Sequence, residues 1–208
     1  YELIEDTVPS VQVSTSKNKK LRIVFTGSMA AGRSPEYLLK PIFEAYQRDK
    51  TLGDHLEVVL AGEADAQNRK MIRYYAMPFV KWLGKISYKE ALALQRTANY
   101  LVVIDNPIAD ASQAVFFPSK LLDYMLARRR ILAITSTGSA TWQVMQDLTG
   151  DTCQHEEPAK VEQYIYLALN AFQAGNIDYL ESVAPPTRYE AKYNADRLYA
   201  ELKQLLNA

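Results

Sequence analysis

The 208-residue sequence has little cysteine and no excess of charge of either sign. Both features limit the classes of protein to which it can belong. Its one cysteine, Cys153, cannot form a disulfide within the chain, so a reducing compartment such as the cytoplasm suits the protein. Lys and Arg total 24 and Asp and Glu also total 24, whereas a general nucleic-acid binder is usually basic. We therefore expect no nucleic-acid partner, and any anion must be bound by a local group of cations.

Long apolar runs are also lacking, since no stretch of about 18 apolar residues occurs, and we expect no membrane-spanning helix. The first residues, YELIEDTVPS, contain no methionine, basic stretch or apolar stretch, so we do not expect them to be a signal peptide. We expect residues 1–20 to be a linker and the sequence to be the middle of a longer protein. Residues 21–208 suffice for one domain with a sizeable core, because 48% of all residues are apolar.

Short apolar segments alternate with helical segments along residues 21–208. The predicted strands are Leu21–Gly27, Leu56–Gly62, Phe79–Gly84, Tyr100–Asp105, Arg130–Thr135 and a weak sixth, Gly150–Gln154. Strands with little alternation, separated by helices, indicate a parallel sheet that is covered on both faces. The sequence therefore predicts an α/β fold: a single Rossmann-like, doubly wound sheet of about six strands in the order 3-2-1-4-5-6.

Ligands of such sheets bind outside the carboxyl ends of the strands, at the switch point between the first and fourth strands. The loop after the first strand, TGSMAAGRSPE, contains the small residues Gly27 and Ser28 and carries Arg33 at its mouth. Small residues let a ligand approach the backbone, and the helix that follows attracts anions to its N-terminus. The loop matches neither the dinucleotide glycine pattern nor a Walker loop. We interpret it as a phosphate or sugar contact, with an ordinary connecting loop as the alternative.

A second candidate segment, PSKLLDYM, begins a predicted helix just before the fifth strand. Ser119 is a natural helix cap, and Lys120 follows at a position where the helix dipole disfavours positive charge. A diphosphate docked there would be held by backbone N–H groups and Lys120, and Asp123 could accept hydrogen bonds from two ribose hydroxyls. The alternative is that Asp123 only complements the dipole while Lys120 extends into water. Because this segment and the first loop converge on one edge of the sheet, we favour the interpretation that they bind a ligand.

Other residues with reactive side chains favour structural roles. Arg128–Arg130 end the predicted helix, where cations complement the dipole. His55 and His155 have no partner at metal-ligand spacing, and we expect both in surface loops. Cys153 is expected to be a small apolar filler, and Glu63 is either a ligand contact or a polar loop start. No Ser-His-Asp pattern and no carboxylate cluster is evident, so we predict no metal site.

The order and spacing of these blocks resemble the C-terminal, donor-binding half of a GT-B glycosyltransferase, most closely the retaining family-four enzymes. The resemblance covers residues 21–205. Its blocks are RIVFTGS with RSPEYLL, LEVVLAGEAD, FVKWLGKISYKEALALQRTANYLVVID, and FFPSKLLDYMLARRRILAIT followed by TGS. Each block alone is weak, and the most specific is PSK-x-x-D-Y ahead of an apolar strand.

The resemblance implies a nucleoside-diphosphate-sugar donor, with no cofactor and no metal. By position, the residues facing the diphosphate would be Gly27, Ser28, Arg33, Ser119 and Lys120. Asp123 would take the place of the ribose-binding glutamate, and Gly84, Lys85 and Ile86 would run beside the base. The family often has another glutamate eight residues before the ribose carboxylate, where this sequence has Val115. That departure leaves the identity of the sugar open.

The resemblance also implies what the whole protein does. We expect a hexosyltransferase of polysaccharide biosynthesis, cytoplasmic or peripheral to the inner membrane, with unassigned catalytic residues. A glycan or lipid acceptor would bind an N-terminal domain that this sequence lacks, so residues 21–208 would bind nucleotide without transferring sugar. Two alternatives stay open: half of a GT-B nucleotide-sugar epimerase, and a Rossmann-like module that has lost its ligand and only holds partners.

Overall fold

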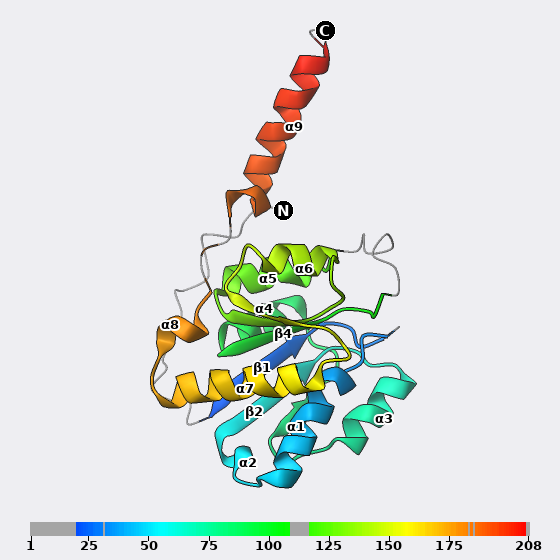
Figure 1. The fold of residues 1–208 in the computed structure, drawn as a ribbon. Helices are drawn as coiled ribbons and strands as arrows, with labels where there is room; N and C mark the ends of the chain where they lie inside the picture. Colours follow the sequence, from blue (N-terminus) through cyan, green and yellow to red (C-terminus); the bar gives the residue numbers. More distant parts are fainter. Residues whose placement is uncertain (1–19, 31, 109–116, 183, 185, 207–208) are drawn as a thin grey trace.

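A computed structural model describes residues 20–30, 32–108, 117–182, 184 and 186–206 of the chain. Its centre is a six-stranded, wholly parallel sheet with helices on both faces (Figure 1). The strands are β1 Leu21–Thr26, β2 Leu56–Ala61, β3 Val80–Trp82, β4 Tyr100–Ile104, β5 Arg130–Ile134 and β6 Gly150–Cys153. The helices are α1 Glu36–Arg48, α2 Leu52–His55, α3 Ala66–Tyr74, α4 Tyr88–Arg96, α5 Lys120–Ala127, α6 Ala140–Met145, α7 Pro158–Gln173, α8 Ile177–Leu180 and α9 Ala191–Leu206, with the 3-10 turn η2 at Thr187–Tyr189.

The strand order is β3-β2-β1-β4-β5-β6, which confirms the predicted doubly wound fold. All six predicted strands are present, including the weak last one. The chain moves outward from β1 through β2 to β3, and then returns to place β4 on the other side of β1. The chain therefore leads from β1 and from β4 to helices on opposite faces, so the carboxyl ends of these two strands mark the switch point of the sheet.

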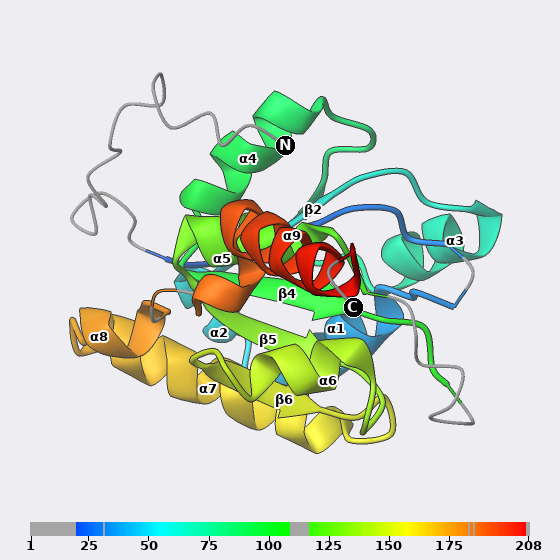
Figure 2. The same cartoon turned by 90° about the horizontal axis from the view of Figure 1, so that it is seen from above.

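The sheet separates two apolar layers, which explains why its strands show little alternation. Ile23 and Phe25 of β1 pack in one layer with α1, α3 and α7, and Val24 packs in the other with α4, α5 and α6 (Figure 2). Leu101 and Val102 of β4 divide in the same way. Burial of each such side chain contributes about 1.5–3 kcal/mol, so both faces stabilise the position of the central strands.

Local capping signals mark the starts of α3 and α4, whereas α5 begins without a side-chain cap. Ser87 and Glu90 form the predicted capping box at α4, and Asp65 caps α3 by accepting a hydrogen bond from the backbone of Asn68. Ser119 is the N-cap residue of α5, as predicted, but its side chain makes no capping hydrogen bond. Its backbone is already helical, with φ −53° and ψ −29°, so its hydroxyl is not placed to accept from the first turn.

Arg128 is the C-cap residue of the helix, as predicted, whereas Arg130 has a structural role through an ion pair and not by complementing a helix dipole. Helix α5 ends at Ala127, Arg128 takes a left-handed conformation with φ 51°, and Arg130 begins β5. The Arg130 guanidinium donates to both Asp151 oxygens, at 2.7 and 2.9 Å. Asp151 also accepts a hydrogen bond from the Tyr100 hydroxyl. This buried ion pair holds β4, β5 and β6 together at their amino ends.

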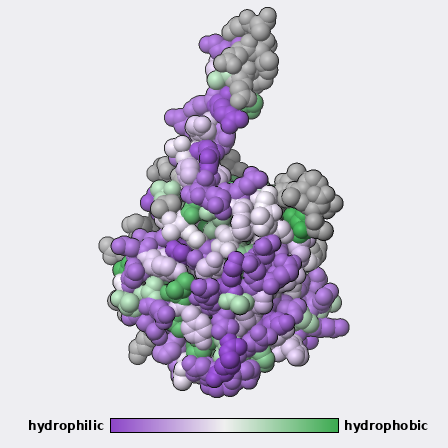
Figure 3. Space-filling model, viewed as in Figure 1, coloured by the Kyte–Doolittle hydropathy of each residue, from purple (hydrophilic) through white to green (hydrophobic). Residues whose placement is uncertain are grey.

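The surface in the view of Figure 3 is mostly hydrophilic, with apolar residues scattered over it. Helix α9 extends away from the sheet beyond η2 (Figure 1). In the described ranges, no helix combines the length and apolar character needed to cross a membrane. The expected linker lies outside the described residues except for Lys20, whose ammonium donates to the Gly53 carbonyl at 2.8 Å.

Replacing Asp151 by Asn should lower the free energy of unfolding by about 3 kcal/mol, because it leaves the buried Arg130 charge without its counter-ion. Urea denaturation followed by circular dichroism measures this change. The matched control is Glu162→Gln, which breaks the exposed ion pair with Arg48 and should leave the midpoint nearly unchanged. Equal midpoints for the two variants would contradict a structural role for the Arg130–Asp151 pair.

Candidate functional site

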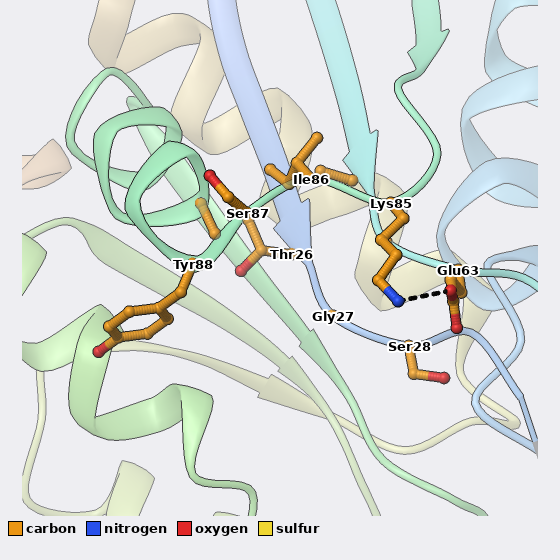
Figure 4. A pocket seen from close by; sticks show the side chains of 11 residues that line it. Thr26, Gly27, Ser28, Glu63, Lys85, Ile86, Ser87 and Tyr88 are labelled. Atoms are coloured by element: carbon orange, nitrogen blue, oxygen red, sulfur yellow. Dashed lines mark ion pairs between the residues drawn. The ribbon is translucent and has the colours of Figure 1, made fainter.

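A pocket of about 250 Å³ lies at the carboxyl ends of β1 and β2, beside the switch point of the sheet (Figure 4). Three loops and the first turn of α4 form its walls. The lining residues are Thr26, Gly27, Ser28, Ala61, Gly62, Glu63, Lys85, Ile86, Ser87, Tyr88 and Ala91. The pocket thus joins the predicted phosphate loop, at Gly27 and Ser28, with Lys85 and Ile86 of the predicted base region.

The floor of the pocket is backbone, because β1 and β2 approach each other closely at Gly27 and Gly62. A Cβ atom at Gly62 would lie 1.9 Å from the Gly27 carbonyl oxygen, and Gly62 has φ +139°. The Gly27 N–H donates to Ala61 at 2.8 Å, and the Gly62 N–H donates to Gly84 at 2.7 Å. Gly84 therefore supports the floor without lining the pocket. No other residue type fits at Gly62 without a shift of the backbone.

Lys120 begins α5 and turns its ammonium group inward, so the alternative that it extends into water is wrong. Its Nζ atom is buried and lies 4.3 Å from the centroid of the Phe25 ring. A Cβ atom at Gly27 would lie 2.6 Å from Nζ, so only a glycine leaves room for the ammonium there. Among the described residues, Nζ has no hydrogen-bond partner.

The electrostatic environment of Lys120 disfavours its charged form. Burial is the largest cause, the positive charge of Arg33 adds to it, and Asp105 opposes it, so that the pKa of Lys120 falls to about 8. Two cations from different elements thus lie close enough for their charges to repel. An oxyanion would relieve both the desolvation of Lys120 and its repulsion from Arg33.

Asp123 lies one turn after Lys120 on α5 and is tied to α4. Its carboxylate accepts a hydrogen bond of 2.9 Å from the Tyr88 hydroxyl. Burial raises the pKa of Asp123, and the hydrogen bond from Tyr88 opposes that rise. Tyr88 lines the pocket, so the carboxylate is connected to the pocket through this ring. Sequence reasoning missed Tyr88, although it follows the cap of a helix that starts at the ligand-binding edge.

A buried polar network lies beneath the pocket and fixes its parts relative to one another. The Tyr124 hydroxyl accepts from the Thr26 backbone N–H at 3.0 Å and donates to Val102 at 3.1 Å. The Thr26 hydroxyl accepts from the Gln95 side chain at 2.9 Å. Burial raises the pKa of Tyr124 to about 12, so this hydroxyl stays protonated at neutral pH. Tyr124 is the last residue of the PSK-x-x-D-Y motif, although the motif did not reveal its hydrogen bonds, and no sequence motif indicated Gln95.

Lys85 and Glu63 face each other at the rim of the pocket (Figure 4). The Lys85 ammonium lies 3.2 Å from a Glu63 oxygen, and both side chains are mostly exposed. Such a pair contributes at most about 1 kcal/mol to stability. Either group is therefore able to reorient towards a ligand at small cost.

His155 is buried, and the prediction that it lies in a surface loop is wrong. Its Nε2 atom is 2.9 Å from the Asp105 carbonyl, and its ring meets Tyr37 edge-on at 4.7 Å between centroids. The Asp105 carboxylate accepts from Thr135 at 2.7 Å. These contacts join the carboxyl ends of β4, β5 and β6 to α1, so His155 supports the edge on which the pocket lies.

The other candidate residues lie outside the pocket or outside the described part of the chain. Cys153 is confirmed as a buried filler, and burial raises the pKa of its thiol to about 12. His55 is exposed at the end of α2. Val115 lies outside the described residues. In the part of the chain that the structure describes, no group of three His, Cys, Asp or Glu side chains gathers to hold a metal ion.

No protein-family model matches this sequence, and no curated protein matches it. Solved structures do resemble it. A UDP-forming α,α-trehalose-phosphate synthase from Burkholderia xenovorans has a TM-score of 0.62 at 10% identity, over 91% of this chain. HepE of Anabaena, in complex with UDP and glucose, has a TM-score of 0.57 at 10% identity, also over 91%. The pneumococcal O-GlcNAc transferase GtfA, in complex with UDP and GlcNAc, has a TM-score of 0.57 at 12% identity.

This chain spans less than half the length of each of those structures: 46% of the synthase, 48% of HepE and 37% of GtfA. At such low identity the similarity establishes the fold and no more. The chain has the Rossmann-like α/β fold that its GT-B neighbours contain, with a six-stranded parallel sheet between two helical layers.

Replacing Lys120 by Met should raise the free energy of unfolding near neutral pH by roughly 3 kcal/mol, because a buried charge is exchanged for an apolar side chain of similar length. The pH dependence follows from the lowered pKa. Between about 8 and 10.5 the unfolded chain binds more protons at Lys120 than the folded chain, so the stability of the wild type rises with pH. Urea denaturation across this window should show the rise in the wild type and lose it in Lys120→Met.

The matched control is Lys85→Met, which removes an exposed ammonium at the rim of the same pocket. It should leave both the midpoint and the pH dependence close to those of the wild type. If Lys120→Met is no more stable than Lys85→Met, then another group compensates the charge of Lys120 in the folded protein, and the prediction is wrong.

Proposed function

We propose that this chain is the donor-binding domain of a glycosyltransferase and binds a nucleoside-diphosphate sugar at the carboxyl edge of its sheet. The observation that carries the proposal is the buried ammonium of Lys120, which faces the backbone of Gly27 with no hydrogen-bond partner among the described residues. An unsatisfied buried cation is costly, and it recurs at sites where a ligand supplies the counter-charge.

The diphosphate would lie between the loop after β1 and the start of α5. Its proposed contacts are Gly27, Ser28, Arg33, Ser119 and Lys120. The first turn of α5 would offer backbone N–H groups, because a helix N-terminus favours anions. Ser119 would contribute through its exposed position at this turn rather than by capping the helix.

The nucleoside would occupy the pocket between β2 and α4. Asp123 would accept hydrogen bonds from the ribose hydroxyls, since Tyr88 occupies only one of its oxygens and a carboxylate has several acceptor sites. Lys85 and Ile86 would lie beside the base, with Gly84 holding their loop against Gly62.

Glycosyl transfer releases the diphosphate as the leaving group, and Lys120 and Arg33 would stabilise the negative charge that develops on it. No metal or cofactor is needed for this role. The chain spans less than half of its structural neighbours, so we assign the acceptor site, for a glycan or lipid, to a further domain. We propose a retaining, family-four-like hexosyltransferase of polysaccharide biosynthesis, working in the cytoplasm or at the inner membrane, whose present chain binds donor without transferring sugar.

Two neighbours support a nucleotide ligand in particular. HepE was solved with UDP and glucose, and GtfA with UDP and GlcNAc. Both share with this chain the sheet whose carboxyl edge forms the pocket. UDP is therefore the first nucleotide to test. GDP and ADP are tested beside it, because the residues that line the pocket do not indicate which base would bind.

A thermal-shift panel of UDP, GDP, ADP and their glucose conjugates tests the proposal. One base should raise the Tm, because a ligand that binds only the folded state stabilises it by RT ln(1 + [L]/Kd), about 2.7 kcal/mol at a hundredfold excess over Kd. The panel should extend to millimolar ligand, since half of a two-domain site binds weakly. No shift with any nucleotide would contradict donor binding and favour an interaction module without ligand.

Binding by variants tests which residues contact the diphosphate and which contact the ribose. Lys120→Ala should weaken both the nucleotide and inorganic pyrophosphate, about tenfold or more, because a charge-assisted hydrogen bond contributes about 1.5–3 kcal/mol. Asp123→Ala should weaken the nucleotide but not pyrophosphate, which has no ribose. The control Asp178→Ala changes an exposed carboxylate on α8 and should bind like the wild type. If Asp123→Ala also weakens pyrophosphate, its assignment to the ribose is wrong.

A further inference from the structure

We infer that the proposed donor site takes up a proton when it binds a diphosphate, and that the amine of Lys120 is the group that receives it. The inference rests on the proposed function, because it concerns the same site and the same ligand chemistry. It adds that the affinity for the donor depends on pH, which would not follow if Lys120 were always positively charged.

The geometry around Lys120 suits a neutral amine as well as an ammonium. The Nζ atom is enclosed by the Phe25 ring, at 4.3 Å from its centroid, and by the backbone of Gly27. An ammonium has three N–H donors, and among the described residues none of them finds an acceptor. A charge held in this way loses its hydration without receiving hydrogen bonds in return, so release of a proton costs little.

The charged and titratable groups near Lys120 do not compensate its charge. On its own helix, the Asp123 carboxylate accepts from Tyr88 of α4. From the loop between β1 and α1 comes Arg33, which has the same sign as Lys120. From the end of β4 comes Asp105, whose charge favours the protonated form of Lys120 but whose carboxylate already accepts a hydrogen bond from Thr135.

The His155 ring contacts the Asp105 carbonyl through Nε2 and packs edge-on against Tyr37 of α1. Tyr124, next to Lys120 on α5, has a pKa of about 12 and stays neutral. The net result of burial, Arg33 and Asp105 is a pKa of about 8 for Lys120 in the free protein.

A bound diphosphate reverses this balance. It brings acceptor oxygens and negative charge to the ammonium, which favours the protonated form and raises the pKa above its value in the free protein. Below about 8 the site already carries its proton and binding is strongest. As the pH rises above that value, each binding event must also take a proton from solution, so the affinity falls.

The size of the effect follows from the pKa in the free protein. At about pH 7 roughly nine-tenths of free sites carry the proton, and at about pH 9 roughly one-tenth do, so the affinity should fall about tenfold between them. Near pH 8 the binding of one ligand should take up about half a proton. Cys153, with a pKa of about 12, does not titrate in this range.

Isothermal titration calorimetry of the 208-residue chain with UDP-glucose tests the inference, and GDP-glucose or ADP-glucose replaces it if that base gives the larger thermal shift. The diphosphate of these donors is esterified on both sides and carries no proton to lose over this range. Titrations near pH 8 in HEPES and in Tris, whose ionisation enthalpies differ, should give apparent enthalpies that differ by about half that difference. Titrations at about pH 7 and about pH 9 should give the tenfold loss of affinity.

Lys120→Arg is the discriminating variant, because a guanidinium keeps its charge throughout this range. It should bind with one affinity at both pH values and with the same enthalpy in both buffers. Lys160→Arg, which changes an exposed lysine on α7 outside the proposed site, is the matched control and should keep the affinity and the pH dependence of the wild type.

Three outcomes would overturn the inference. Wild-type binding with equal enthalpies in both buffers and equal affinities at both pH values leaves donor binding intact and removes the role of proton uptake. Proton uptake that persists in Lys120→Arg assigns the proton to another group. No binding by the wild type at either pH overturns the proposed function itself, and the inference with it.

Discussion

The hydrogen bond between the Tyr124 hydroxyl and the Thr26 backbone is the contact on which the rest of the site depends. It fixes α5 to the last residue of the central strand, and Gln95 fixes α4 to the same residue. From that point the chain continues into Gly27, α5 begins with Lys120, and α4 begins beside the pocket. Elements far apart in the sequence therefore meet at one place with a defined geometry.

Two cations at opposite ends of the sheet differ in whether they have a counter-ion. At the amino end, the charge of Arg130 is matched by both oxygens of Asp151 and stabilises three strands. At the carboxyl end, the charge of Lys120 has no such partner among the described residues and destabilises the fold. Proteins commonly accept such a loss of stability where function requires it. Under the proposed function, a ligand bound at the carboxyl end would supply the counter-charge that Lys120 does not find among the described residues.

The fold was predictable from the sequence because its signals are local or periodic. Apolar runs such as Tyr100–Ile104 mark buried parallel strands, and the Ser87–Glu90 box marks a helix start by itself. The inward turn of Lys120 was not predictable, because it depends on the space that Gly27 leaves on another element. His155 was misplaced for the same reason, since its partner Asp105 is distant in the sequence. Pattern reasoning found which segments converge, but not which side chains they bury.

The floor of the pocket consists of main-chain atoms from Gly27 and Gly62, whereas its rim consists of side chains such as Lys85, Glu63 and Tyr88. A backbone floor keeps its shape when neighbouring side chains are exchanged, provided that both glycines remain. The rim is exposed and contributes little to stability, so it is free to change. Under the proposed function, ligand preference can therefore change through the rim while the sheet and the backbone floor stay the same.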